Sequence, residues 1–138
     1  VGKAQYAIRE NIGKATLELV KRNAENPDKI YLLDRCVFDF IAYTRCFAKK
    51  GLVSEECLNT VEKVCKDYWK YYDLVCYLGI EFPIVADGVR SEDEDLRKQV
   101  DSEIFKQILW NKVRAIQLSG TVLQRVSDLQ NAVNSIYL

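Results

Sequence analysis

Several residue types and patterns are missing from this chain of 138 residues, and each absence excludes a class of function. The chain has no histidine, so a histidine-based catalytic triad is impossible and a zinc site would lack its commonest ligand. None of its five cysteines forms a Cys-x-x-Cys pair, so the spacing typical of zinc sites is missing too. Its 20 basic and 20 acidic residues cancel, which excludes a broad electrostatic footprint for nucleic acid or for an anionic membrane.

Long apolar runs and methionine are also missing. No run approaches the roughly 20 residues that a membrane-spanning helix needs, and no signal peptide is visible. Each cysteine falls on an apolar strand or helix pattern, which favours buried free thiols in a reducing compartment. We therefore expect a soluble, cytoplasmic protein. The absence of methionine, even at position 1, indicates a processed, truncated or incompletely represented chain.

The residues that are present predict an α/β fold. With 49% hydrophobic and 29% charged residues, the chain can bury a real core as one domain over 1–138, or as the C-terminal part of one. Apolar runs predict buried strands at 30–34, 73–78 and 113–118. Amphipathic patterns predict helices at 3–25, 36–49, 55–71, 92–110 and 122–133. This alternation predicts a three-layer sandwich, in which helices cover both faces of a parallel sheet.

Three local signals predict where the helices end and begin. Gly51 follows two lysines and is a natural residue to close the helix at 36–49. Ser54 is a good N-cap for the next helix, and Ser91 can cap the helix that follows the second strand.

Asp34 and Arg35 come directly after the first predicted strand, where a parallel sheet binds its ligands. A carboxylate there can hold magnesium or take a proton, and a guanidinium can fork onto phosphate. The alternative is an N-cap aspartate followed by a surface arginine, and the local sequence leaves both interpretations open.

Three blocks of the chain resemble the distal part of a P-loop kinase-like ATP-binding family, which includes the kinase domain of NadR, the nicotinamide riboside kinase. The first block is Leu33-Asp34-Arg35 with Asp39 and Tyr43. The second runs from Tyr72 to Arg97 and contains Asp87-Gly88-Val89-Arg90-Ser91, and the third is Leu118-Ser119-Gly120-Thr121 with Gln124-Arg125-Val126. The resemblance covers about residues 28–133, and the second block is its most specific part.

The resemblance implies a kinase that transfers a phosphoryl group from ATP, with Mg²⁺, to a small hydroxyl-bearing acceptor such as a nucleoside. It implies that Asp34 is the metal-linked or general-base carboxylate, and that Arg35 contacts phosphate. Arg90 and Arg97 would be lid arginines that close over the transferred group. The substrate-binding residues would be Asp39 and Tyr43, and Gly120 and Thr121 would lie against the nucleotide.

Each of these roles has a structural alternative that the sequence leaves open. Arg90 and Arg97 can pair with the acidic run at 92–95 on a solvated surface. Asp39 can merely pair with Arg35, and Gly120 can be only a turn requirement.

The chain departs from the family in one motif, because it has no Gly-x-x-x-x-Gly-Lys-[Ser/Thr] loop to cradle phosphates. Gly13-Lys14, the nearest match, is followed by Ala15. The strand that carries this loop in the family would lie between those at 30–34 and 73–78. We expect the sequence to be part of a larger chain; the other interpretation is a fold rebuilt around the loss of that strand.

Two other classes of function are open. The missing loop favours a non-catalytic or regulatory domain that binds ATP or GTP. A purely helical interaction module is favoured only if the strand predictions fail. The expected partners are a nucleotide and a small-molecule substrate, with neither nucleic acid nor membrane; the acceptor, the choice of ATP or GTP and the oligomeric state are open at this stage.

Overall fold

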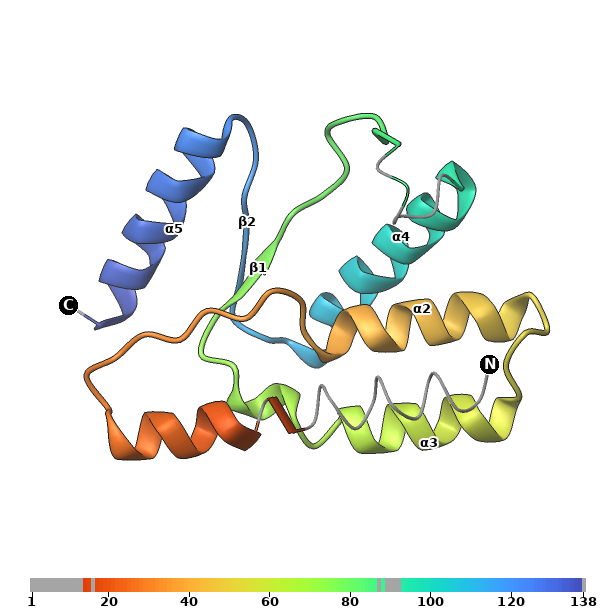
Figure 1. Ribbon diagram of the computed structural model, residues 1–138, viewed down its shortest axis with the longest axis horizontal. Helices are drawn as coiled ribbons and strands as arrows, with labels where there is room; N and C mark the ends of the chain where they lie inside the picture. The colour runs from red at the N-terminus through yellow and green to blue at the C-terminus, as the bar shows by residue number, and fades with distance from the viewer. Residues whose placement is uncertain (1–13, 16, 87, 89–92, 138) are drawn as a thin grey trace. The chain divides into compact units, whose positions relative to one another are not determined.

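The computed structural model describes residues 14–15, 17–86, 88 and 93–137 of the chain (Figure 1). The chain forms two compact units, Val1–Tyr72 and Asp73–Leu138. Most of the described residues are helical, and two short strands make the fold mixed α/β. The organisation of residues 1–138 as one domain stays a prediction. Among the described residues, no helix is both long enough and apolar enough to span a membrane.

The first unit is built on helices α2 (Val37–Lys49) and α3 (Glu55–Cys65), which pack together. Residues 14–15 and 17–25 are also helical, in agreement with the helix predicted at 3–25, whose remaining residues lie outside the described part. The core of this unit contains Val37, Phe38, Ala42 and Cys46 of α2 with Val61 and Cys65 of α3, all buried. Arg45 of α2 and Glu62 of α3 join the two helices through an ion pair of 2.6 Å.

The connection between α2 and α3 follows the predicted caps. Gly51 has a φ of +71°, which places it in the left-handed region that favours glycine. Its N–H donates to the carbonyl of Ala48, and the N–H of Leu52 donates to the carbonyl of Phe47, each at 2.9 Å. These two bonds form a Schellman motif that closes α2. Ser54 then caps α3, because its hydroxyl accepts a bond from the N–H of Cys57.

The helix predicted at 55–71 is shorter than expected. α3 ends at Cys65, and a 3₁₀ turn, η1 (Trp69–Tyr71), follows it. From Asp67 onward the backbone bonds span three residues rather than four, as in the bond from the N–H of Tyr68 to the carbonyl of Cys65. Aspartate and aromatic residues are weak helix formers, which accounts for the tightening of the chain over this aromatic stretch.

The prediction of a strand at 30–34 is wrong. Residues 29–33 carry no regular secondary structure, and residues 34–35 form a bend before α2. Leu32 is 73% exposed, and Ile30 and Leu33 are also exposed. An apolar run becomes a strand only when a neighbouring strand offers backbone partners, and the described residues of this unit contain no strand.

The second unit contains the parallel strand pair that the sequence predicted. β1 (Val75–Tyr77) pairs with β2 (Ala115–Gln117) in the register Val75↔Ala115 and Tyr77↔Gln117. Helices α4 (Glu94–Asn111) and α5 (Val122–Tyr137) lie on opposite sides of the pair (Figure 1). The strands are shorter than predicted, but their type, direction and position are confirmed.

The start of α4 corrects one cap. Ser91, the predicted N-cap, lies outside the described residues, and the structure assigns this position to Asp93. The carboxylate of Asp93 accepts a bond of 2.9 Å from the N–H of Leu96, in the geometry expected of an N-cap.

Candidate functional site

Asp34 and Arg35 lie in the bend between the irregular residues 29–33 and α2. Both side chains are exposed, and neither forms a hydrogen bond or ion pair with another described residue. Arg35 has a φ of +75°, a left-handed conformation that is uncommon for any residue with a side chain. The structure thus presents an accessible carboxylate and an accessible guanidinium side by side at the start of a helix.

Asp39 and Tyr43 follow Asp34 and Arg35 on α2, but both make contacts within their own helix. The carboxylate of Asp39 accepts a bond of 2.9 Å from the N–H of Cys36, the N-cap residue. Its observed partner is therefore the helix terminus and not Arg35, the structural alternative that the sequence left open, and its predicted contact with a substrate stays a prediction. Tyr43 is half-buried, and its ring lies 6.1 Å from the ring of Phe47, one turn further on.

Cys36, at the same helix start, has a buried thiol of raised pKa. Burial, supported by the negative charge of Asp39, raises the pKa of its thiol to about 12. The thiol therefore stays protonated at neutral pH, and the helix start offers oxygen and guanidinium chemistry only.

Of the two predicted lid arginines, the structure describes only Arg97. Arg90 lies outside the described residues, so its role stays a prediction. Arg97 lies in the first turns of α4, and its guanidinium is 3.5 Å from the carboxylate of Glu94. This pair with the acidic run is the structural alternative that the sequence offered. It is partly exposed and of a kind worth about 0–1 kcal/mol, so a stronger anionic partner can replace it at low cost.

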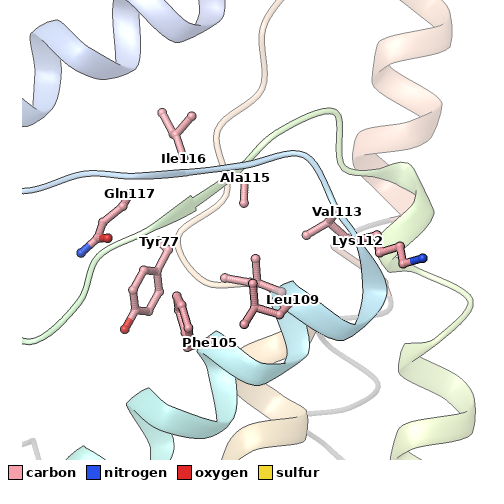
Figure 2. A pocket seen from close by; sticks show the side chains of 9 residues that line it. Tyr77, Phe105, Leu109, Lys112, Val113, Ala115, Ile116 and Gln117 are labelled. Carbon is pink, nitrogen blue, oxygen red and sulfur yellow. The ribbon is translucent and has the colours of Figure 1, made fainter.

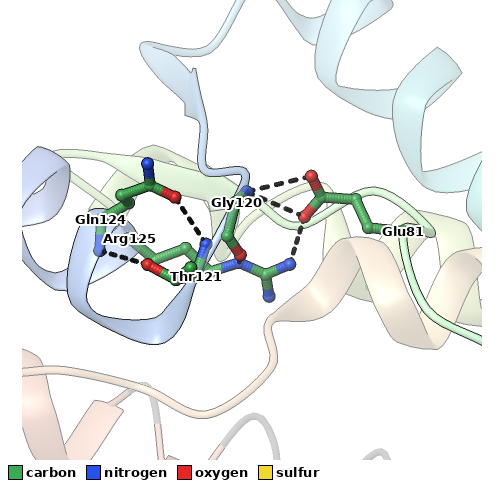
Figure 3. Close-up of polar contacts among 5 residues, drawn as sticks. All are labelled: Glu81, Gly120, Thr121, Gln124 and Arg125. Carbon is green, nitrogen blue, oxygen red and sulfur yellow. Dashed lines mark hydrogen bonds and ion pairs between the residues drawn. The ribbon is translucent and has the colours of Figure 1, made fainter.

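Gly120 is the centre of a polar cluster at the turn between β2 and α5 (Figure 3). Its N–H donates to both carboxylate oxygens of Glu81, at 3.0 and 3.2 Å. Its carbonyl accepts a bond of 3.1 Å from Nε of Arg125, whose guanidinium also pairs with Glu81. We call Glu81, Gly120 and Arg125 the Glu81 cluster. It is closed, because each of its three members contacts the other two.

Thr121, beside Gly120, begins α5 through a reciprocal cap. The N–H of Thr121 donates to the side-chain carbonyl of Gln124 at 2.7 Å, and the N–H of Gln124 donates to the Thr121 hydroxyl at 3.2 Å. Gly120 and Thr121 were predicted to lie against the nucleotide, and the backbone N–H of each is used by a side chain of the chain itself.

The charge state of Glu81 follows from its donors. The Gly120 N–H has the largest effect and lowers the pKa of the Glu81 carboxyl; desolvation comes next and opposes it, and the hydrogen bond and charge of Arg125 lower the pKa further. Arg125 also lies over the ring of Phe82, with 5.2 Å between the guanidinium carbon and the ring centroid. The guanidinium is thus fixed by a carbonyl, a carboxylate and an aromatic face, and only 19% of the Arg125 side chain is exposed.

A pocket of about 350 Å³ lies on the other side of the strand pair, between the strands and α4 (Figure 2). It is lined by Tyr77, Phe105, Ile108, Leu109, Lys112, Val113, Ala115, Ile116 and Gln117. The phenol of Tyr77 donates to Asp101 at 2.8 Å, and its pKa is raised to about 12 by desolvation and by that carboxylate. A protonated phenol and a largely apolar lining offer neither a general base nor a cradle for phosphates.

The part of the chain that the structure describes is compatible with one mode of magnesium binding. The described residues contain no group of three or more cysteine, aspartate or glutamate side chains placed to hold a metal ion. In nucleotide sites, however, magnesium keeps several waters and takes one or two carboxylates together with phosphate oxygens. The accessible carboxylate of Asp34 is enough for that mode.

The predicted site residues fall into two groups. Asp34, Arg35, Asp39 and Tyr43 belong to the first unit, and Arg97, Gly120 and Thr121 belong to the second. In the first unit Asp34, Arg35 and Asp39 lie at the start of α2; in the second unit Arg97 lies on α4, whereas Gly120 and Thr121 lie at the turn before α5. The single cleft that was predicted around Asp34, Arg35 and Arg90 stays a prediction.

Glu81 and Arg125 are the residues that sequence reasoning missed. Arg125 stood in the third block of resemblance but was given no role, and Glu81 lies 39 positions before its partner Gly120. The only available signal was the position of Glu81 just beyond the end of a buried strand, where ligand-facing residues gather.

Comparison with known proteins places the chain in a family. No curated protein and no solved structure matches it. A family model described as an AAA domain matches residues 3–125, which is most of the chain. This family belongs to the P-loop NTPases and includes NadR-like kinase domains, and membership implies nucleotide binding with hydrolysis or phosphoryl transfer. The chain is therefore a member of an AAA domain family of P-loop NTPases.

Proposed function

We propose that the full-length protein transfers the terminal phosphoryl group of ATP to a small hydroxyl-bearing acceptor, a nucleoside in the first instance. The observation that carries this proposal is the family match over residues 3–125, which spans the first two blocks of resemblance to NadR-like kinases and the third as far as Arg125. It is supported by the exposed Asp34-Arg35 pair at the start of α2. We also propose that β1 and β2 belong to a larger parallel sheet in a three-layer sandwich.

Asp34 and Arg35 have complementary roles in this proposal. When bound, Mg²⁺ neutralises charge on the phosphates, and Asp34 is the carboxylate of this chain that would hold it. Arg35 contacts a phosphate, for which its planar guanidinium is well suited. Asp39 stays engaged at the helix start, so its part is to fix the backbone beside Arg35, and Tyr43 contributes a wall to the acceptor site.

Arg90 and Arg97 supply charge to the transferred group. Phosphoryl transfer depends on positioning and on neutralising negative charge, so a mobile arginine contributes most when the group is in transit. Arg97 exchanges its exposed pair with Glu94 for the phosphoryl group. Both residues act in the closed state of the enzyme.

The test of binding compares two neutralised carboxylates in the full-length protein. Isothermal titration with ATP and Mg²⁺ should give weaker binding for Asp34→Asn than for the wild type. Asp28→Asn, an exposed position in the same unit, is the matched control and should bind as the wild type does. If Asp34→Asn bound ATP with Mg²⁺ as tightly as Asp28→Asn does, Asp34 would not be part of the binding site.

The test of chemistry uses Arg90→Ala. If one contact made only in the transition state is lost, kcat should fall by roughly 10²–10³ while KM changes little. An unchanged kcat with a raised KM would show instead that Arg90 binds the ground state.

A regulatory nucleotide-binding domain is the second candidate. It is favoured by the absence of a Gly-x-x-x-x-Gly-Lys-[Ser/Thr] loop from the sequence and by the occupied donors of Gly120 and Thr121. Nucleotide binding without turnover toward any nucleoside would support this candidate over the kinase.

A further inference from the structure

The pocket between the strand pair and α4 lies within the second unit and includes none of the residues proposed to contact the nucleotide. Its volume of about 350 Å³ is of the size that small-molecule sites have. Ala115 of β2 points toward α4, and its short side chain leaves this space open (Figure 2). The pocket is therefore a candidate binding site that the proposed phosphoryl transfer does not use.

The walls of the pocket are aromatic and apolar. The rings of Tyr77 and Phe105 lie with their centroids 5.6 Å apart at an angle of 49°. Because the Tyr77 hydroxyl is engaged by Asp101, this residue offers its ring to a ligand. Phe105 is 45% exposed and Leu109 is 58% exposed. A flat apolar ligand would remove these side chains from water and would lie against the aromatic rings, both of which favour binding.

Lys112 supplies the only charge among the nine residues that line the pocket. It is exposed, and its ammonium forms no hydrogen bond or ion pair with another described residue. Figure 2 shows it at the rim with its ammonium turned outward, and its flexible stem lets the ammonium swing over a bound ligand. A single ammonium with no partner complements one negative charge on that ligand.

The backbone of Lys112 adds a second observation. It ends α4 with a φ of +50°, in the left-handed region that glycine adopts at lower cost. A side chain in such a conformation is a reason to look for a function there. The chain thus carries an unpartnered cation, on a costly backbone, beside an apolar pocket.

We propose that this pocket binds a small aromatic monoanion, whose ring lies against Tyr77, Phe105 and Leu109 and whose carboxylate pairs with Lys112. Gln117, at the other end of the pocket, offers its amide to a polar substituent on the ring. One ammonium beside an apolar lining suits a carboxylate better than a triphosphate, which needs several donors. This inference does not rest on the proposed function.

The first experiment compares two probes that share a ring system and differ in charge. Isothermal titration of the full-length protein with 2-naphthoate and with 2-naphthamide should give tighter binding of the anion by roughly 3–10-fold, the scale of one hydrogen-bonded charge pair at a surface. Equal affinities would overturn the role of Lys112. No binding of 2-naphthoate at millimolar concentration would overturn the site.

Lys112→Gln tests the cation, and Lys98→Gln is the matched control, because Lys98 is exposed on the same helix but does not line the pocket. Lys112→Gln should weaken 2-naphthoate to the affinity of 2-naphthamide, and Lys112→Arg should restore most of the difference. Lys98→Gln should bind both probes as the wild type does. Equal losses in the two glutamine variants would assign the effect to net charge and overturn the pairing.

Phe105→Ala tests the apolar wall. It should weaken both probes by roughly 3–10-fold, since the ring contact is lost whatever the charge of the ligand. Because Phe105 is already 45% exposed, the variant should keep the circular dichroism spectrum of the wild type. Unchanged affinity for both probes would overturn the proposed position of the ring.

Two further readouts separate this site from other occupants. In the ¹⁵N-labelled protein, 2-naphthoate should shift the amide signals of Ala115 and Gln117 and leave that of Cys57, in the other unit, unchanged. ATP with Mg²⁺ should not displace 2-naphthoate; displacement would assign the pocket to the nucleotide and overturn the inference. Loss of 2-naphthoate binding as the protein concentration rises would assign it to a second copy of the chain. Binding of 2-naphthoate without any binding of ATP would overturn the proposed function and leave this site intact.

Discussion

The carboxylate of Glu81 takes its properties from its partners, because it is too exposed for burial to dominate. The Gly120 N–H and the Arg125 guanidinium both favour the charged form, and together they outweigh the desolvation that opposes it. An acid held in this way stabilises the folded state only while it is ionised. Its contribution to stability therefore depends on pH.

Glu81→Gln should lower stability in a pH-dependent way. The folded pKa lies below the ordinary value of 4.5, so the stabilisation by Glu81 is complete above that value and is lost as the pH falls through the folded pKa. Urea unfolding of both proteins between about pH 2.5 and 7 measures this difference. The gap in the free energy of unfolding should be widest at neutral pH and close in acid. A gap that does not change with pH would contradict the assignment.

Some site residues follow from sequence and others do not. Asp34 and Arg35 were predicted from their place after an apolar run that was interpreted as a buried strand; because residues 30–33 form no strand and are largely exposed, their role now depends on the family resemblance and stays a prediction. Gly120 was predicted as a turn, and its φ of +84° agrees. Its partner Glu81 was not predicted, because a contact across 39 positions between two loops leaves no periodic signal in the sequence.

The helices of the first unit show which element boundaries are set locally. The end of α2 at Lys49 and the start of α3 at Glu55 agree with the caps predicted at Gly51 and Ser54, because capping depends on residues within one turn. The end of α3 was predicted six residues too late. The periodic pattern of apolar residues continues through the aromatic stretch. The backbone tightens there because these residues are weak helix formers, and the spacing of apolar residues carries no information on helix propensity.

Gly51→Ala should destabilise the first unit by roughly 1–2 kcal/mol, the cost of a left-handed conformation for a residue with a Cβ. No atom lies within 4 Å of the added methyl group, so backbone strain is the only source of the loss. Gly51→Asn should lose less, because asparagine tolerates this region. Chemical denaturation of the three proteins gives the ranking. If Gly51→Ala and Gly51→Asn lost equal stability, the loss would not depend on how well each residue tolerates the left-handed region, and backbone strain would not be its source.

The strands show the limit of element prediction. The segments at 73–78 and 113–118 have the same apolar character as the segment at 30–34, yet only the first two form a ladder. Pairing depends on a neighbour that is distant in sequence, so composition predicts the capacity to form a strand but not the strand itself. The parallel direction was predictable, because α4 provides the crossover that parallel strands require.

At the scale of the whole molecule, the family match and the composition point in the same direction. A chain with no net charge has no broad field to attract polyanions, so recognition of a nucleotide must come from particular donors and guanidinium groups. The described residues provide several of these, at the start of α2 and before α5. The resemblance predicted both places as nucleotide contacts, which stays a prediction, and the structure shows that the Gly120 and Thr121 donors are engaged by side chains.

ATP with Mg²⁺ should stabilise the folded full-length protein against heat. A ligand at about 100 times its dissociation constant contributes about 2.7 kcal/mol if it binds only the folded state. For 138 residues that corresponds to a rise in Tm of roughly 6–12 °C, and for a longer full-length protein to a smaller rise; differential scanning calorimetry measures it directly. Adenosine at the same concentration is the control, and a protein unmoved by either compound would argue against a nucleotide site.

Because Arg35 has a left-handed backbone, selection for stability and selection for activity should favour different residues at this position. Glycine would adopt the φ of +75° more cheaply by roughly 1–2 kcal/mol, so a library screened for thermal stability should enrich Arg35→Gly. A library screened for phosphoryl transfer should discard the same variant, because it has lost its guanidinium. Deep mutational scans under the two pressures would therefore disagree at this position, and the disagreement would separate a strained functional residue from a merely exposed one.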